Sequence, residues 1–258
     1  MTEPVLDTSR PSSARVWNFI LGGKDNFEID RALAAQILER FPEIAVLARE
    51  QRKFLGRALD FLVHEAGVRQ FLDIGTGLPT ADNTHEVAQR LAPESRIVYV
   101  DNDPLVLAHA RALLTSSPEG ATDYIDASVQ DPDLILREAA RTLDFDRPVG
   151  LVMLGILGNV ADYDEARAIL RRLLGALPSG SYLVLSDGTD TSSEARSGHQ
   201  AAKDQGHPYN ARSVAQVEGY FEGLELVEPG VVPIPRWRPG DGEVPPATDG
   251  RSGVARKR

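Results

Sequence analysis

The stretch QFLDIGTGLPTADNTHEVAQRLAPESRIVYVDND, residues 70–103, decides how this chain folds. It begins with a short apolar run, passes through two closely spaced glycines, and ends in a second apolar run that stops at Asp101. Between the two runs, Asn83 and Glu86 have the spacing of an N-cap residue and its third-position partner, which starts a helix. We therefore predict a strand, a tight turn, a helix and a parallel strand, which is one βαβ unit of a nucleotide-binding sheet.

The residues around the two glycines indicate which nucleotide this unit binds. A dinucleotide fingerprint has a third glycine after Gly75 and Gly77, and here that place is taken by Thr80. Asp73 precedes the turn, where a carboxylate repels pyrophosphate and attracts a cation. Asp101 stands where acidic residues accept hydrogen bonds from ribose hydroxyls. S-adenosylmethionine (SAM), which carries an ammonium and a sulfonium, fits this set. The alternative is a tight turn that binds no ligand.

Composition excludes several classes of protein. The chain has 258 residues, of which 42% are hydrophobic, and no cysteine, so disulfides, thiolate metal sites and cysteine nucleophiles are absent. The longest apolar run, near residues 149–157, is far shorter than the roughly 20 residues of a membrane helix. A net charge of −10 argues against a nucleic-acid partner. We expect a cytoplasmic protein without metal or membrane contacts, and the sequence carries no signal for oligomeric state.

The N-terminal part reads as a helical cap. Residues 1–12 are polar, contain two prolines and are predicted to be disordered, and residues 13–66 show helical apolar spacing. Asp25 and Glu28 suit a capping box for the second of these helices. Lys24, between a glycine pair and that cap, is either a solvated loop residue or a ligand contact. Arg52 lies off the apolar stripe of the third helix, a position more typical of a solvent-facing side chain than of a ligand contact.

Residues 67–258 are predicted to form one α/β domain with seven strands, mostly parallel. The third strand ends at Asp126, which can accept a hydrogen bond from an adenine amino group. The fourth strand is fully apolar, as expected for a strand buried on both faces. It is followed by Gly155, a small residue that lets a ligand lie against the strand end. Residues 188–210 are polar and are predicted to form a mobile lid.

Cap and core together resemble a bacterial family of SAM-dependent methyltransferases, found mainly in actinomycetes and long described only as a family of unknown function. The matching motifs are ARVWNFILGGKDNFEIDR, RKFLGRAL, FLDIGTGLPT, VYVDNDPLVLAHARALL, RPVGLVML, GSYLVLSD, LELVEPGVVPIPRWRP and GVARK. They cover most of the chain from Ala14 onward, and the segment LGGKDNF is particular to that family. The resemblance implies a Rossmann-like class I methyltransferase fold with an N-terminal helical cap.

The resemblance also implies roles for single residues. Those expected to bind the cofactor surround its methionine half (Asp73, Gly75, Thr76, Gly77), its ribose (Asp101) and its adenine (Asn102, Asp126, Ala127). The N-terminal segment would fold over the cofactor and bring Arg15, Lys24, Asp25 and Asn26 close to the methyl group or the substrate. The chain departs from the family at GILGN, residues 155–159, where relatives often carry a histidine and an aromatic residue, and at Asp187, where they often carry a histidine.

The function predicted from the sequence is transfer of a methyl group from SAM to an oxygen or nitrogen of a small molecule or peptide. The catalytic residue is not determined, and the candidates for a general base are Asp187, Tyr163, His199 and Asp25. Two alternatives stay open. A SAM-binding protein without catalysis would share the same cofactor residues. An NAD-dependent oxidoreductase would share the βαβ unit, although Thr80 and Asp73 argue against it.

Overall fold

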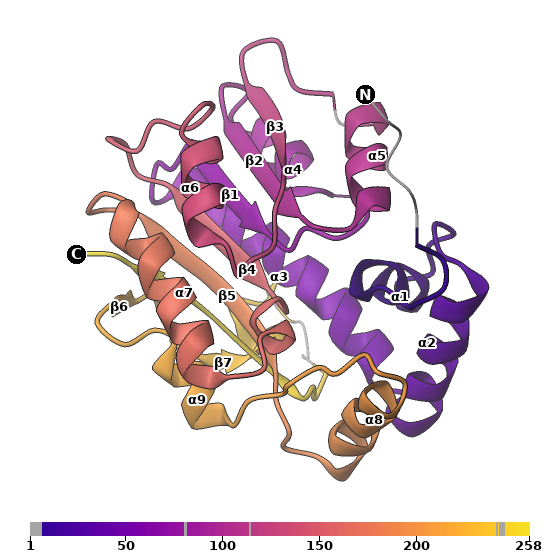
Figure 1. Cartoon of the computed structure of the whole chain (residues 1–258). Coiled ribbons are helices and arrows are strands. Elements are labelled where there is room, and N and C mark those ends of the chain that lie inside the picture. Colours follow the sequence, from indigo (N-terminus) through magenta and orange to yellow (C-terminus); the bar gives the residue numbers. More distant parts are fainter. Residues whose placement is uncertain (1–6, 80–81, 114, 241, 243–245) are drawn as a thin grey trace.

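The computed structural model describes residues 7–79, 82–113, 115–240, 242 and 246–258. Within them, eight strands form one sheet at the centre of the molecule (Figure 1). The strands are β1 (Gln70–Ile74), β2 (Arg96–Asp101), β3 (Ala121–Asp126), β4 (Gly150–Leu154), β5 (Tyr182–Gly188), β6 (Glu225–Leu226), β7 (Val232–Pro233) and β8 (Gly250–Arg256).

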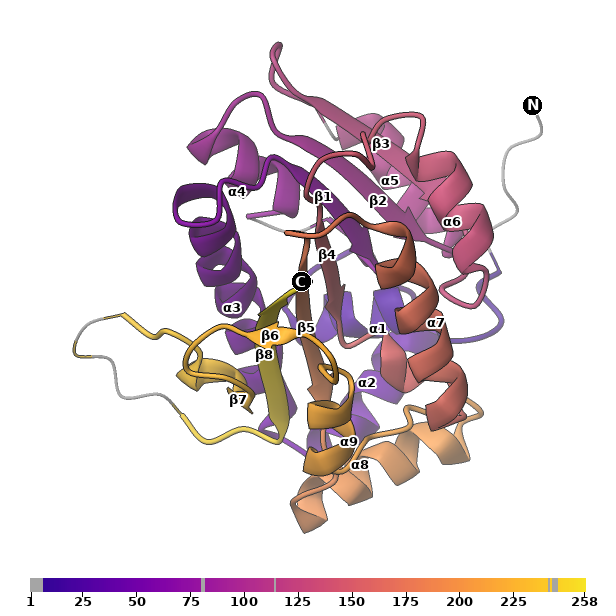
Figure 2. The same ribbon diagram turned by 90° about the vertical axis from the view of Figure 1, so that its left-hand side faces the viewer.

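The strand order is β3-β2-β1-β4-β5-β8-β6, and β7 pairs with β8. Strands β1 to β5 are parallel, whereas β8 is antiparallel to β5, β6 and β7. This arrangement confirms the expected mostly parallel α/β sheet and the class I methyltransferase fold that the resemblance implied. The expected strands are all present, and the two-residue β7 is an addition at the edge, visible in Figure 2 beside β6 and β8.

Helices cover both faces of the sheet. They are α1 (Ser13–Ile20), α2 (Glu28–Arg40), α3 (Ile44–His64), α4 (Thr84–Leu91), α5 (Pro104–Leu113), α6 (Pro132–Ala139), α7 (Tyr163–Ala176), α8 (Ser193–Asp204) and α9 (Val214–Gly219), with short 3-10 turns at Leu157–Asn159 and Ile234–Arg236. None of these helices is both long and apolar enough to cross a membrane, as judged over the described ranges.

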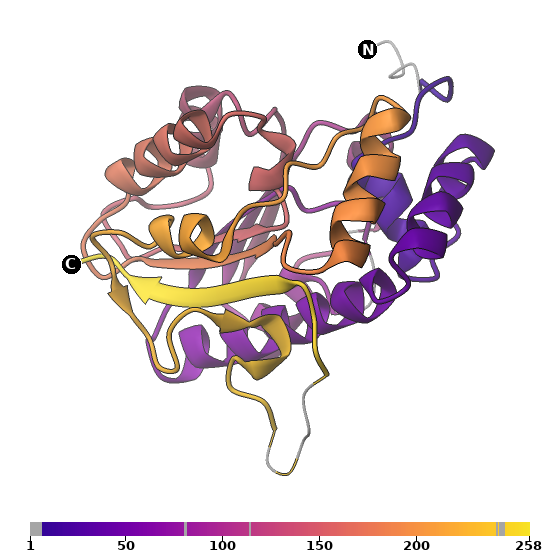
Figure 3. The same cartoon turned by 90° about the horizontal axis from the view of Figure 1, so that it is seen from below.

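The side chains along each strand point alternately to the two faces of the sheet and pack into two separate cores. Leu72 and Leu151 belong to the core shared with α6, α7 and α9, while their neighbours Phe71 and Val152 belong to the core shared with α3 and α4. Successive side chains of a strand point to opposite faces, so strands buried on both sides read as the continuous apolar runs seen in the sequence. Figure 3 shows the sheet between these two layers.

A third core lies beyond the carboxyl ends of the parallel strands. It consists of apolar side chains of α1, α2, the start of α3 and α8, among them Ile20, Leu33, Phe41 and Ala202. Figures 1 and 3 show α2 and α8 side by side at this end of the molecule. Residues distant in sequence therefore form one roof over the strand ends.

Candidate functional site

The turn after β1 brings backbone close to the strand ends. Gly75 and Gly77 have φ angles of 76° and 68°, in the left-handed region that favours glycine. The Gly75 amide donates to the carbonyl of Val100 at 2.8 Å. A Cβ at Gly75 would lie 2.6 Å from Cδ1 of Ile156, so no larger residue fits there without displacing the segment after β4. Thr80, at the third position of the fingerprint, lies outside the described residues.

Asp101 closes the turn from the neighbouring strand. Its Oδ2 accepts a hydrogen bond from the Gly77 amide at 2.8 Å, and its Oδ1 accepts one from the Asp103 amide at 2.9 Å. Burial raises the pKa of Asp101, and the two amides oppose that rise because they stabilise the charged form. The carboxylate is thereby held in one orientation beside the cavity described below.

Asp73 is a buried carboxylate under the turn. It is 7% exposed, and its Oδ2 accepts a hydrogen bond from the Thr84 hydroxyl at 2.6 Å. Burial raises the pKa of Asp73 to about 6, against the opposing effects of that hydrogen bond and of the positive charge of Arg52. A group this costly to ionise gains from a cation placed next to it, which is a common property of functional sites.

The prediction of a solvent-facing Arg52 is wrong. Its side chain is partly buried, lines the cavity, and donates from Nη2 to the carbonyl of Asp82 at 2.7 Å. The reason is the path of α3, which packs its apolar stripe on the sheet and presents an adjacent face to the strand ends. Gln51, next to it, also lines the cavity, and its Oε1 accepts from the Ser186 hydroxyl at 3.1 Å.

The cavity at the strand ends has a volume of about 690 Å³, within the ~300–1,000 Å³ of ordinary ligand pockets. One side is formed by the turn after β1 and by the ends of β2, β3 and β4. The other side is formed by α1, α2, α3, α8 and the segment 207–209. The predicted residues that line it are Arg15, Asp73, Gly75, Thr76, Gly77, Asp101, Asn102, Ala127, Gly155 and His199.

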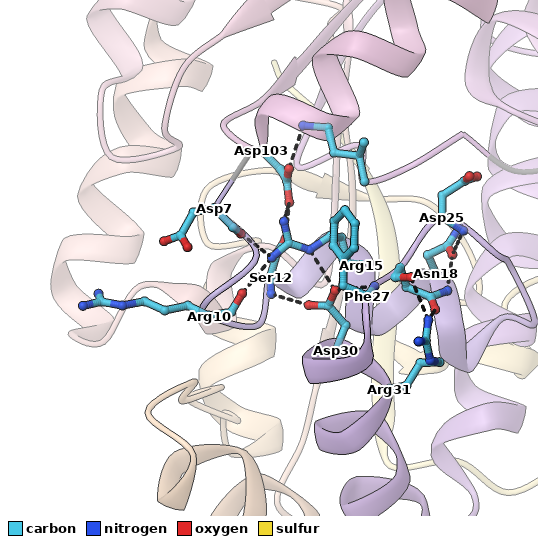
Figure 4. Close-up of polar contacts among 12 residues, drawn as sticks. Asp7, Arg10, Ser12, Arg15, Asn18, Asp25, Phe27, Asp30, Arg31 and Asp103 are labelled. Atoms are coloured by element: carbon cyan, nitrogen blue, oxygen red, sulfur yellow. Dashed lines mark hydrogen bonds and ion pairs between the residues drawn. The ribbon is translucent and has the colours of Figure 1, made fainter. Parts of the chain in front are cut away.

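The LGGKDNF segment is a folded loop around one amide side chain. Oδ1 of Asn18 accepts hydrogen bonds from the Asp25 amide at 3.1 Å and from Nδ2 of Asn26 at 2.9 Å. A Cβ at Gly23 would lie 2.3 Å from the Asn18 amide nitrogen, so glycine is required where the loop folds over that side chain. Figure 4 shows Asn18 pointing to this loop.

The predicted capping box of Asp25 and Glu28 is wrong. Helix α2 begins two residues later than that pairing requires, with Phe27 in extended conformation as its N-cap. Asp30 caps it instead, because its Oδ2 accepts from the Phe27 amide at 2.9 Å. Asp25 lies within 3.8 Å of His109 on α5.

A buried ion-pair cluster joins this cap to the sheet (Figure 4). Nε of Arg15 donates to Oδ2 of Asp30 at 2.9 Å, and Nη1 of Arg15 lies 3.8 Å from Oδ2 of Asp103. The Ser12 hydroxyl donates to the same Asp103 oxygen, and the Ser12 amide donates to Asp30. Nη2 of Arg15 donates to the carbonyls of residues 7 and 10. The guanidinium therefore fastens the N-terminal segment beside the end of β2.

A second polar group stands across the cavity, after β5. The Tyr209 hydroxyl donates to Oδ1 of Asp187 and accepts from the Gly188 amide at 3.1 Å. Burial raises the pKa of Asp187 to about 6, and the bond from Tyr209 and the charge of Arg212 act in the opposite direction. The ring of His199 stacks on Tyr209 at 5.4 Å between centroids.

Comparison with known proteins shows the family to which this chain belongs. Residues 1–258 match the model of a family described as S-adenosyl methyltransferase. The chain belongs to this family. It is 45% identical to a family DUF574 protein from Streptomyces avermitilis, with 98% of this chain and 99% of that one covered and a TM-score of 0.93. It is 41% identical to a protein from Thermobifida fusca provisionally called a methyltransferase, with 99% and 98% covered and a TM-score of 0.90. A search of curated proteins finds no match.

The protein is a SAM-dependent methyltransferase, and its cofactor is SAM. The turn, Asp73 and Asp101 fit that cofactor. Gly75 leaves a cradle that a Cβ would fill, and Asp73 offers a buried negative charge to a cation. The carboxylate of Asp101 borders the cavity beside them.

Other predicted residues of the methyltransferase lie away from the cavity lining. Asp126 is exposed at the end of β3, and Lys24 is exposed in the loop after α1. Tyr163 donates its hydroxyl to the carbonyl of Gln216 at 2.7 Å. Asp187 is fully buried and lies behind Tyr209. Sequence reasoning missed Tyr209 because a tyrosine in an aperiodic polar segment carries no local signal.

Proposed function

We propose that this methyltransferase transfers the SAM methyl group to an oxygen or nitrogen of a small molecule or peptide. The observation that supports this most directly is the pair of carboxylates at the ends of β1 and β2, Asp73 and Asp101, on either side of a glycine turn that borders a 690 Å³ cavity. Bound SAM supplies an electrophilic methyl group on a positively charged sulfur.

The cofactor half of the cavity has a distinct partner for each part of SAM. Asp73, with Gly75, Thr76 and Gly77, would hold the methionine part, where a positive ammonium offsets the cost of ionising the buried carboxyl. The outer lone pairs of Asp101 would accept hydrogen bonds from the ribose hydroxyls, since its inner ones are held by backbone amides. Asn102 and Ala127 line the cavity beyond β2 and β3, where the adenine would lie.

The acceptor then lies on the side of β4 and β5. In the order β3-β2-β1-β4-β5, these cofactor residues lie in the first three strands or in the turns that follow them. The remaining cavity wall comes from Gly155, the end of β5 and the roof helices. Residues of this wall hold the acceptor next to the methyl group and exclude water, and such positioning supplies about 7–11 kcal/mol in favourable cases.

Calorimetric titration tests the cofactor site. We expect SAM and S-adenosylhomocysteine (SAH) to bind the wild type at micromolar concentration, and Asp101→Ala to weaken both by about tenfold or more. NADH is the matched control, because it shares the adenosine but carries a pyrophosphate that Asp73 repels. Binding of NADH without SAM would refute the proposal.

Acceptor class is tested by turnover. Incubation with methyl-labelled SAM and separate pools of small molecules and peptides, followed by base treatment of the products, distinguishes esters from ethers and amines. Label in carbon–methyl products alone would contradict transfer to oxygen or nitrogen. We also propose a cytoplasmic location and no nucleic-acid substrate, supported by the absence of cysteine and the net charge of −10.

A further inference from the structure

Apolar residues form a continuous part of the roof side of the cavity. Side chains from α1, α2 and α3 that line it include Val16, Trp17, Ile20, Ile37, Ile44 and Leu47, and α8 contributes Gly198 and Ala202. We call this set the roof chamber. An occupant that fits it presents apolar surface, because burying apolar side chains against an apolar group is favourable and burying them against a hydrated group is not.

Three polar side chains of α1 that line the cavity already have partners. The Arg15 guanidinium is bound to Asp30 and to backbone carbonyls. The Asn18 amide is bound in the loop after α1. The Ser13 hydroxyl lies 2.9 Å from Nε2 of His207. A charged acceptor next to these three side chains would lose its water and gain no new hydrogen bond from them, which is unfavourable.

His199 differs from these three side chains. Its ring lines the cavity, stacks on Tyr209 and meets Phe41 edge to face at 6.4 Å between centroids. Its Nδ1 is buried, and no hydrogen-bond partner for it exists among the residues that the structure describes. A neutral imidazole held rigidly between two aromatic rings, with unused hydrogen-bonding capacity, is suited to accept a proton.

We propose that the roof chamber binds an uncharged, largely apolar acceptor bearing a phenol-type hydroxyl, and that His199 takes the hydroxyl proton. The inference rests on the proposed function and specifies its substrate class. The acceptor oxygen forms a bond to the methyl carbon, the carbon–sulfur bond breaks with its electron pair going to sulfur, and SAH leaves as a neutral thioether. The hydroxyl proton goes to the His199 ring.

The charges near His199 are consistent with this role. Burial lowers the pKa of His199, and Asp190 and Asp249, in the segments before α8 and β8, act against that change. The Oδ1 of Asp249 is bound to the Thr191 hydroxyl and the Ser192 amide. The carboxyl of Asp187 is separated from the imidazole by Tyr209. The ring is therefore neutral at physiological pH and able to accept a proton.

Three probes of similar shape and different charge test the proposed acceptor binding. They are 4-butylphenol, 4-butylbenzoate and 4-butylbenzylammonium, each titrated into protein loaded with SAH. We expect the phenol to bind about tenfold or more tightly than either ion. Ala202→Phe, which fills the roof chamber, should abolish phenol binding and leave SAH binding unchanged. Gln200→Ala, an exposed neighbour on the same helix, is the control and should change neither.

Turnover of 4-butylphenol to 4-butylanisole tests His199. We expect His199→Gln to keep phenol affinity and lower kcat by about 10²-fold or more. The wild-type rate should fall in acid as the imidazole becomes protonated, and the variant should lose that limb of the pH profile. A merely structural histidine would leave the profile unchanged.

The outcomes separate the two proposals. SAH binding with no phenol binding, or with equal binding of the ions, overturns the acceptor inference and leaves the methyltransferase assignment intact. Phenol turnover that His199→Gln leaves unaffected overturns the role of the histidine. Failure to bind SAH at all overturns the cofactor site on which both proposals depend.

Discussion

Replacing Asp73 by asparagine is expected to stabilise the free protein and to weaken cofactor binding. Asparagine has the same shape and retains an oxygen that accepts from the Thr84 hydroxyl. It removes only the charge. The carboxyl of Asp73 is buried, and we propose that it binds a cation. Its negative charge therefore lowers the stability of the free protein and strengthens the binding of the positively charged cofactor.

The magnitude follows from the pKa. Burial raises the pKa of Asp73 from 3.8 to about 6, and at 1.36 kcal/mol per pKa unit the ionised carboxylate destabilises the fold by about 3 kcal/mol at neutral pH. The folded pKa lies above the unfolded one, so the folded state holds the proton more tightly. Stability therefore falls as pH rises from about 4 to about 6, and the full cost is present above that range.

Asp73→Asn removes this cost. Urea unfolding at about pH 7.5 should show a gain of up to about 3 kcal/mol, reduced because Arg52 loses a nearby negative charge, and the gain should fall to about half at about pH 5. Titration with SAH should show affinity weakened about 10- to 100-fold, the value of a hydrogen bond to a charged group. Asp146→Asn, an exposed aspartate before β4, is the control and should change neither quantity.

The critical result is that Asp73→Asn raises the stability of the protein and at the same time weakens its binding of SAH. Loss of stability above about 1 kcal/mol at neutral pH, or unchanged SAH affinity, would refute the assignment of Asp73 as a charge kept for the ligand. A gain that did not depend on pH would show that the stabilisation comes from packing and not from the removed carboxylate.

Three further substitutions test other parts of the site. Gly75→Ala should lower stability and SAH affinity together, because its Cβ meets Ile156 at 2.6 Å, and Ile156→Ala in the same chain should restore part of both, measured by thermal unfolding and calorimetry. Asp30→Ala should cost about 3–5 kcal/mol in urea unfolding, since it leaves the buried Arg15 guanidinium without its hydrogen-bonded carboxylate, with only Asp103 at 3.8 Å, and a loss below about 1 kcal/mol would contradict that pairing. Asp101→Asn should weaken SAM and SAH equally, because both carry the same ribose, and a selective loss of SAM would contradict a ribose contact.

Sequence reasoning succeeded where neighbouring residues settle the structure. The pairing of Asn83 with Glu86 starts α4 as predicted, with the Asn83 amide donating to Oε2 of Glu86 at 2.8 Å. It failed at Asp25, where the predicted capping pattern lies two residues before the observed one. Asp30 takes the same place in the pattern two residues later. Its partners Arg15 and Ser12 belong to α1 and to the residue before it, which local sequence does not reveal.

The sequence by itself determined the parallel sheet, the glycine turn and the acids at the ends of β1 and β2, because strand alternation, glycine torsions and helix caps are encoded within a few residues. Only the tertiary structure decided which side chains from other parts of the chain face the cavity. Arg52, His199 and Tyr209 come from segments far apart in the chain, and their placement depends on how α3 and α8 pack over the strand ends. Burial then sets the charge of such groups, and burial is a property of the folded molecule.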